Sequence, residues 1–132
     1  MSSPDDVTYF TKLGADECRD LLASRRVGRV AWQTERGIDV LPVNFAIDGE
    51  VIAFHTFEGS ALERLLEPTE VSFQADDIDE ESAIGWSVLA HGTSGPLRSA
   101  SETESWAPGA DVGIAISITR IGGRVVSGHI TK

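Results

Sequence analysis

The segment from Leu41 to Leu66, LPVNFAIDGEVIAFHTFEGSALERLL, constrains the fold of this chain more than any other. Two apolar runs flank Asp48-Gly49, and Asp-Gly between alternating hydrophobic residues is a strong hairpin signal because a tight turn needs a positive φ at its centre. A Gly59-Ser60 turn then opens a short helix, in which Ser60 and Glu63 have the spacing of a capping box. The segment therefore predicts two antiparallel strands and a helix whose positive end can hold a phosphate.

The length and charge of the chain exclude several classes of fold and partner. The 132 residues suit one domain without a second core. A formal net charge of −10 argues against a nucleic-acid backbone or an anionic membrane as the main partner. No stretch has the length and apolarity of a bilayer span, and the N-terminus has neither a basic region nor a long apolar core, so a cytoplasmic protein is expected.

The order of apolar residues predicts a mainly β domain over residues 13–132, preceded by a flexible arm over residues 1–12. A short helix over Asp16–Ser24 directs Cys18 and its apolar neighbours to one face. The single cysteine is expected in the core rather than as a nucleophile, since no base partner is evident. Alternation elsewhere predicts six short strands and favours an antiparallel barrel or sandwich. These strands are Val27–Thr34, Ile38–Ile47, Val51–Thr56, Glu70–Ala75, Gly85–Thr93 and Val112–Ile121.

Two features interrupt this pattern. Pro42 removes a hydrogen-bond donor from its strand, so we expect it at an edge, a bulge or a place where the backbone faces a ligand. Gly122-Gly123 is interpreted as a turn, because no helix follows it as a nucleotide-binding glycine motif would require. A second capping-box spacing predicts a helical turn over Ser101–Trp106.

No metal site or catalytic triad is predicted. The acidic tract from Asp76 to Glu81 has the wrong spacing for an EF-hand, with Ser82 in place of the glycine and Val88 in place of the final glutamate. A solvated loop is the simpler interpretation. The histidines lie on separate segments, at positions His55, His91 and His129.

The order and spacing of several short motifs resemble the pyridoxamine 5′-phosphate oxidase-like flavoproteins. The resemblance covers residues 13–126 and rests on VGRVAW, PVNF, FHTFEGSALERL, VSFQAD and GWSVLAHG. It implies a six-stranded antiparallel split β-barrel with short flanking helices, which forms a homodimer and binds FMN in clefts between the subunits. A planar ring suits an apolar slot, and a phosphate suits a helix N-terminus.

The resemblance also implies roles for nine residues. Along the isoalloxazine it places Pro42, Val43 and Asn44; around the phosphate, His55, Thr56 and Ser60; near the flavin ring, Trp86 and Ser87; and from the partner subunit, Trp106. Simpler interpretations remain open for three of them. His55 is equally well a polar residue on an exposed strand, Ser60 a helix cap, and Trp86 a core or dimer-interface residue.

The sequence departs from the family pattern at the phosphate. Relatives have a lysine or arginine just after the Gly-Ser turn, where this chain has Ala61 and Leu62, and an arginine at the position of Val40. His55 also stands where many members have arginine. Losing such charge-assisted contacts weakens FMN binding, unless Arg29, Arg64 or Arg124 replaces them.

Two functions follow from these expectations. The first is an FMN-dependent oxidoreductase acting on an unidentified small molecule, with a deazaflavin as co-substrate by family analogy. The alternative is a flavin-free split-barrel protein that acts as a binding or interaction module.

Overall fold

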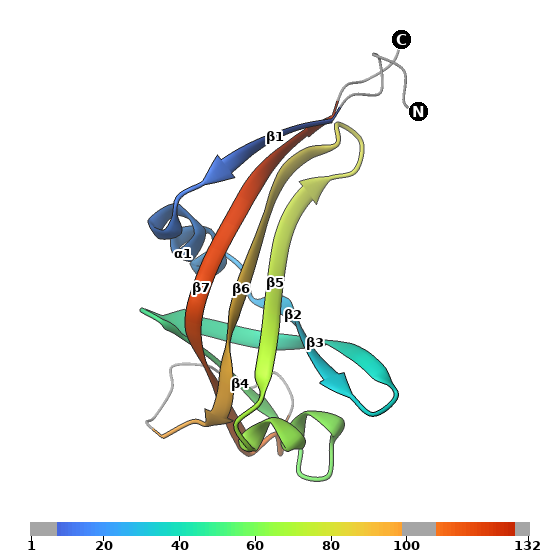
Figure 1. The fold of residues 1–132 in the computed structure, drawn as a ribbon, viewed down its shortest axis with the longest axis vertical. Helices are drawn as coiled ribbons and strands as arrows, with labels where there is room; N and C mark the ends of the chain where they lie inside the picture. Colours follow the sequence, from blue (N-terminus) through green and yellow to red (C-terminus); the bar gives the residue numbers. More distant parts are fainter. Residues whose placement is uncertain (1–7, 99–107, 129–132) are drawn as a thin grey trace.

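The computed structural model describes residues 8–98 and 108–128 and contains seven strands with two short helices. Strands β5, β6 and β7 run the length of the molecule, and β2 and β3 cross them in its lower half (Figure 1). The strands are β1 (Thr8–Leu13), β2 (Val27–Thr34), β3 (Gly37–Asp48), β4 (Val51–Thr56), β5 (Glu70–Asp79), β6 (Ile84–Pro96) and β7 (Val112–Gly128). The helices are α1 (Ala15–Ala23) and the 3-10 helix η2 (Ala61–Leu66).

All seven strands belong to one antiparallel sheet that closes on itself. The order is β1-β7-β4-β3-β2-β5-β6, and β6 pairs again with β7, so six strands form a ring and β1 extends it along β7. Closure removes most of the open edges that an antiparallel sheet would otherwise expose. The predicted split β-barrel is therefore confirmed, with a seventh strand added to the predicted six.

The additional strand lies where the sequence predicted part of a flexible arm. Thr8–Leu13 pairs with β7 from Thr8 opposite Gly128 to Leu13 opposite Gly123. The segment TYFT is rich in β-branched and aromatic residues, which favour strands, but a strand this short needs a partner far along the chain. Residues 1–7 of the predicted arm lie outside the described residues.

The predicted turn at Gly122-Gly123 is wrong, because both glycines lie inside the long strand β7. A Cβ at Gly123 would lie 2.8 Å from the carbonyl oxygen of Ser87 and 3.0 Å from Cys18 Sγ. Glycine is needed there for the close approach of α1 to the sheet, and no reversal of the chain occurs.

The ring encloses the hydrophobic core. Phe54, Phe73 and Ile114 are fully buried inside it, and Phe45 meets Phe73 edge to face with ring centroids 4.7 Å apart. Helix α1 covers one side with Cys18 and Leu22, both without solvent exposure. Burial raises the pKa of the Cys18 thiol, which agrees with its predicted place in the core.

Strand β3 is half open along one edge. It pairs with β2 from Gly37 to Asn44, but its pairing with β4 begins only at Phe45. Pro42 thus lies where β3 has a partner on one side only, as the sequence predicted. The hairpin that follows turns at Gly49, which has a φ of +59°.

The acidic tract that was expected as a loop lies partly in β5. Asp76, Asp77 and Asp79 belong to that strand, and only residues 80–83 form the turn to β6. Hydrogen bonds from Ser82 lower the pKa of Asp79. These bonds link the carboxylate to its own turn, which fits the expected solvated surface.

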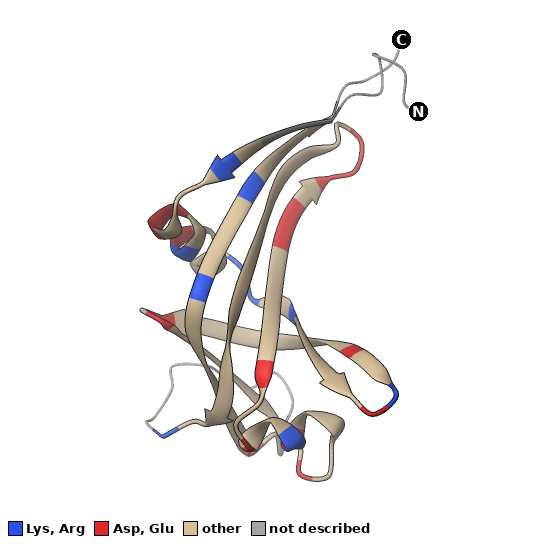
Figure 2. Ribbon diagram, in the orientation of Figure 1, with Lys and Arg blue, Asp and Glu red and all other residues tan. Residues whose placement is uncertain are grey.

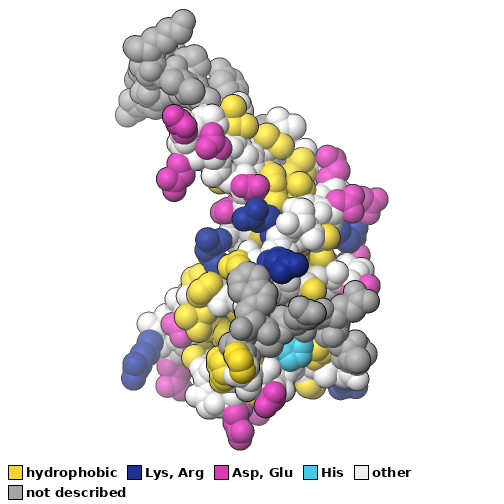
Figure 3. Space-filling view, turned by 180° about the vertical axis from the view of Figure 1, so that it is seen from behind, with side chains coloured by type: hydrophobic (Ala, Val, Ile, Leu, Met, Phe, Trp, Pro, Cys, Tyr) yellow, Lys and Arg dark blue, Asp and Glu magenta, His cyan; other side chains and the backbone are white. Residues whose placement is uncertain are grey.

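Several large hydrophobic side chains remain exposed. The view from behind shows hydrophobic groups on this face, with acidic side chains mostly along the outline of the molecule (Figure 3).

Neither helix among the described residues is long and apolar enough to cross a membrane.

Candidate functional site

The predicted phosphate site at the start of η2 is occupied by the protein's own groups. The buried hydroxyl of Thr56 lies 2.8 Å from Ser60 Oγ, so these two side chains bond each other. The Gly59 N–H donates to Glu63 Oε2 at 3.3 Å, and Ser60 makes no side-chain cap. The predicted capping box is therefore wrong, because Ser60 does not cap the helix and Glu63 bonds Gly59 in place of Ser60. A carboxylate at the start of a six-residue 3-10 helix does not favour a second anion.

His55 lies on the other side of the sheet from this helix start. Successive residues of a strand point to opposite faces, so Thr56 points into the ring and His55 points out. The His55 Nε2 atom lies 3.5 Å from where a Cβ of Gly113 would be, and its Nδ1 is buried without a hydrogen-bond partner among the described residues. The three residues expected around one phosphate are thus divided between two faces.

The residues predicted around the flavin ring are divided in the same way. On β3, Pro42 and Asn44 face outward, while Val43 is only 6% exposed and belongs to the core. On β6, Trp86 packs against the core and Ser87 faces the other side. Trp106, with the predicted helical turn around it, lies outside the described residues.

Three cations gather on β1 and β7 instead. Figure 2 shows basic segments along these two strands and acidic segments along β5. Lys12 of β1 lies directly opposite Arg124 of β7, and Arg120 precedes Arg124 on the same face of β7. Like charges directly opposite each other on a sheet are destabilising, so an anion between Lys12 and Arg124 would stabilise the pair.

A hollow beside these cations has a volume of about 650 Å³, and we call it the β6–β7 hollow. Its wall is apolar at Leu13, Leu89 and Ile121, and polar groups from Gln74 and Ser87 reach it from the neighbouring strands. Gln74 Nε2 donates to Ser87 Oγ at 3.2 Å and to Asp76 Oδ2 at 2.8 Å, which fixes the amide. The remaining lining residues are Lys12, His91, Arg120, Gly122, Gly123 and Arg124.

Gly122 leaves this hollow open. A Cβ built at Gly122 meets nothing within 4 Å, in contrast to the crowded Gly123. A flat backbone surface next to apolar side chains is what a planar aromatic ligand can lie against.

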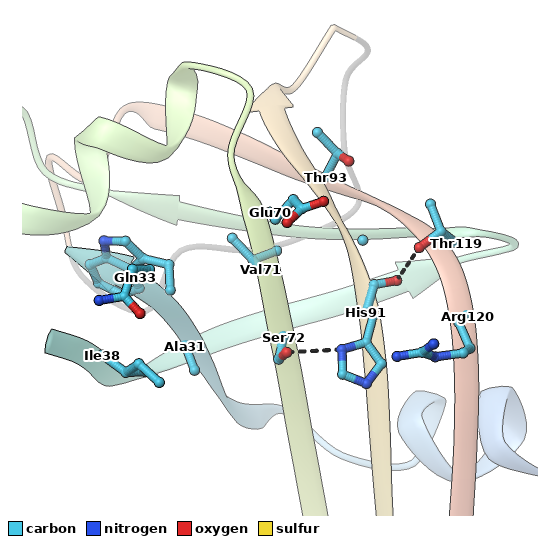
Figure 4. Close-up of a pocket in the computed structure, with 12 residues that line it drawn as sticks. Ala31, Gln33, Ile38, Glu70, Val71, Ser72, His91, Thr93, Thr119 and Arg120 are labelled. Carbon is cyan, nitrogen blue, oxygen red and sulfur yellow. Dashed lines mark hydrogen bonds between the residues drawn. The ribbon is translucent and has the colours of Figure 1, made fainter.

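A second hollow of about 730 Å³ adjoins the first, and we call it the β5–β6 hollow. Figure 4 shows the His91 ring between Ser72 on one side and the Arg120 guanidinium on the other. The Ser72 Oγ and His91 Nδ1 atoms are 3.0 Å apart, and Thr119 Oγ1 donates to the His91 carbonyl at 3.1 Å. Since His91 and Arg120 line both hollows, the two hollows lie side by side.

One of the residues predicted from the sequence lines a hollow. Of the predicted site residues that the structure describes, Ser87 lines the β6–β7 hollow, and none lines the β5–β6 hollow. Arg124 was considered as a replacement cation and does line the first hollow. Sequence reasoning missed Lys12, His91 and Arg120 because their meeting depends on strand register, which short motifs do not carry.

The chain resembles known proteins both in sequence and in fold. A family model described as pyridoxamine 5′-phosphate oxidase matches residues 14–121. The structure resembles that of an FAD-binding protein from Mycobacterium smegmatis, with 32% identity, a TM-score of 0.74, and coverage of 89% of this chain and 98% of that one. It also shares its fold with an FAD-binding protein from Mesorhizobium loti at 21% identity, with a TM-score of 0.73 and coverage of 92% and 99%.

A curated relative is known from Mycobacterium tuberculosis. The uncharacterized protein Rv0080 is 30% identical over 96 residues, which cover 69% of this chain. This chain spans 63% of the length of that relative.

Proposed function

The chain belongs to the pyridoxamine 5′-phosphate oxidase family, and from that premise we propose that it is a flavin-dependent oxidoreductase that binds FMN. The observation that carries this proposal is the β6–β7 hollow, where an open apolar surface ends at two cations in a chain of net charge −10. The M. smegmatis relative is described as FAD-binding, which supports a flavin as the ligand.

The residues of the hollow fit a flavin nucleotide. Leu89 and Ile121 offer apolar contact to the ring, and Gly122 leaves room for it. Lys12 and Arg124 hold the phosphate by charge-assisted hydrogen bonds, in place of the cations absent at Ala61 and Val40. Ser87 and Gln74 supply hydroxyl and amide groups to the polar edge of the ring.

When bound, the flavin supplies the redox chemistry, by accepting or donating two electrons. The chain positions the ring and excludes water from one of its faces. A small molecule in the adjoining β5–β6 hollow is the proposed substrate, and a diffusible deazaflavin is a second candidate by family analogy.

The protein acts as a homodimer in this proposal. The outer side of the barrel keeps large apolar side chains exposed at Ile38 (68%), Val40 (55%) and Leu89 (43%), beside the two hollows. A two-fold partner would cover these side chains and close the hollows from solvent. Light scattering is expected to give twice the chain mass at micromolar concentration, and Ile38→Asp to give a monomer while Phe57→Asp stays dimeric. A monomeric wild type would overturn the dimer.

A flavin-free binding module is the second candidate, and one observation favours it. Glu63 occupies the start of η2, where the family pattern expects a phosphate, and neither Ala61 nor Val40 can offset its charge. The titration below separates the two functions.

The proposal is tested by titrating purified protein with FMN and with FAD while following flavin fluorescence. Wild type is expected to bind FMN, and Gly122→Val to bind at least about a hundredfold more weakly because the branched side chain fills the hollow. Gly95→Val is the matched control, since a Cβ at Gly95 also meets nothing within 4 Å but lies outside both hollows. Wild type that binds neither flavin would support the flavin-free module. Tight binding by Gly122→Val would place the flavin elsewhere.

A further inference from the structure

The β5–β6 hollow contains a histidine held between a hydroxyl and a cation. The register of β5 and β6 puts Ser72 directly opposite His91, and their side chains are hydrogen-bonded at 3.0 Å. Arg120 is the register partner of His91 on the other neighbouring strand, and its guanidinium lies beside the ring on the side away from Ser72 (Figure 4). Three consecutive strands thus bring these groups into one row.

The Ser72 bond holds the imidazole ring in place. A hydroxyl can donate to Nδ1 or accept from it, so this bond forms with either tautomer of the ring. The Nε2 atom is left to hydrogen-bond a ligand.

The side chain of Arg120 is a hydrogen-bond donor that faces the hollow. Among the described residues its guanidinium makes no hydrogen bond or ion pair, and a guanidinium can only donate. A guanidinium next to an imidazole, with both aimed into a hollow, forms a pair of donors for an oxygen anion.

The rest of the hollow limits where an anion can lie. Glu70 lines the same hollow and repels a second anionic group at its own position. Ala31 of β2, Ile38 of β3 and Val71 of β5 give the hollow apolar lining. A ligand that suits all of these groups has one acidic group and an apolar or neutral body.

We infer that Arg120 and His91 form the recognition subsite for the oxyanion of the substrate, and that the substrate is a small acid with a single carboxylate or phosphate on an apolar body. Ser72 acts as a positioning residue that holds the imidazole. This inference rests on the proposed function, because it assigns a substrate class to the hollow that adjoins the flavin hollow.

The test uses benzoate, phenyl phosphate and the neutral benzamide as probes, with the full chain and NMR of the His91 side chain as the readout. Benzoate or phenyl phosphate is expected to shift the His91 resonances saturably, while benzamide at the same concentrations does not. Arg120→Gln should weaken binding of the acid at least about tenfold, and Ser72→Ala should change the nitrogen shifts that report the His91 tautomer. The acid that binds more tightly identifies the source of the oxyanion as a carboxylate or a phosphate.

Arg36→Gln is the matched control, because it removes a cation from the exposed turn between β2 and β3 and lies outside both hollows. Equal loss of acid binding in Arg36→Gln and Arg120→Gln, no shift of His91 by either acid, or unchanged binding in Arg120→Gln would each overturn the inference. Each titration is run without flavin and with saturating FMN. Acid binding that depends on Arg120 in a protein that does not bind FMN would sustain the inference while the flavin proposal fails, and FMN binding without acid binding would give the reverse result.

Discussion

Two regions of this protein are candidates for holding the phosphate of the proposed flavin, the start of η2 and the Lys12–Arg124 pair. The first has the local features of a phosphate site, with a Gly-Ser turn, hydroxyls and a helix start, but its groups satisfy one another through the Thr56–Ser60 and Gly59–Glu63 bonds. The second has no motif, yet the pairing of β1 with β7 sets two like charges directly opposite each other at the edge of an open hollow.

The difference shows that a motif describes which groups are near along the chain, whereas a binding site depends on which groups the strand register places around an open hollow. At the helix start the acceptor is a carboxylate that belongs to the protein. On β7 the cations face a hollow. We therefore propose the strands, and not the helix start, as the phosphate site.

Removing both cations of the pair should have the largest effect. The double change Lys12→Gln with Arg124→Gln is expected to weaken FMN binding at least about a hundredfold, because two charge-assisted contacts are lost. Flavin fluorescence titration measures this, with Arg36→Gln as a control in the exposed turn between β2 and β3. Wild-type affinity in the double variant would assign the phosphate to another site.

A side chain added at Gly123 should destabilise the protein, whereas one added at Gly122 should not. Gly123→Ala is expected to lower the free energy of unfolding by about 1 to 3 kcal/mol, because its Cβ meets the Ser87 carbonyl at 2.8 Å and the neighbouring helix. Gly122→Ala is the control and should be neutral or slightly stabilising. Urea denaturation followed by tryptophan fluorescence gives both values, and equal stability of the two variants would contradict the packing described for β7.

The hydroxyl pair at the helix start should matter for stability and leave flavin binding unchanged. Thr56→Val removes a bond between a buried hydroxyl and Ser60 and should lower the free energy of unfolding by about 1 kcal/mol. Ser60→Ala breaks the same bond, so the double variant should be less destabilised than the sum of the two. A Thr56→Val protein that folds normally but loses FMN would show that the helix start binds the ligand.

Restoring the family's cation after the turn should have the smallest effect. Ala61→Lys is expected to change FMN affinity by no more than about twofold, since an isolated exposed charge contributes little and Glu63 holds the start of the helix. The same fluorescence titration measures it. A gain of tenfold or more would support the helix start over the strands.

The sequence predicts the barrel well because its signals are local. The apolar runs on either side of Asp48-Gly49, together with that turn, predict the hairpin without knowledge of its other partners. The predicted strand at Val51–Thr56 agrees with β4 at both ends. Strand β1 was missed because its pairing with β7 joins the two ends of the described chain, and no local pattern records such a partner.

The candidate site is less predictable for the same reason. Ser72, His91 and Arg120 are separated along the chain and meet only through the registers of β5, β6 and β7. The family pattern names residues that lie on both faces of the sheet here, such as the inward Thr56 and the outward His55. Strand alternation could have separated those two in advance, because neighbours in a strand face opposite ways.

The phosphate assignment is tested most directly by comparing the affinities of FMN and riboflavin, which differ only by the phosphate. The ratio of the two affinities measures what the phosphate contributes, and it should be determined for wild type, Arg124→Gln and Glu63→Gln. We predict that Arg124→Gln lowers the ratio at least about tenfold while riboflavin binding is kept, and that Glu63→Gln leaves the ratio unchanged. A ratio preserved in Arg124→Gln and increased in Glu63→Gln would contradict the assignment and place the phosphate at the start of η2.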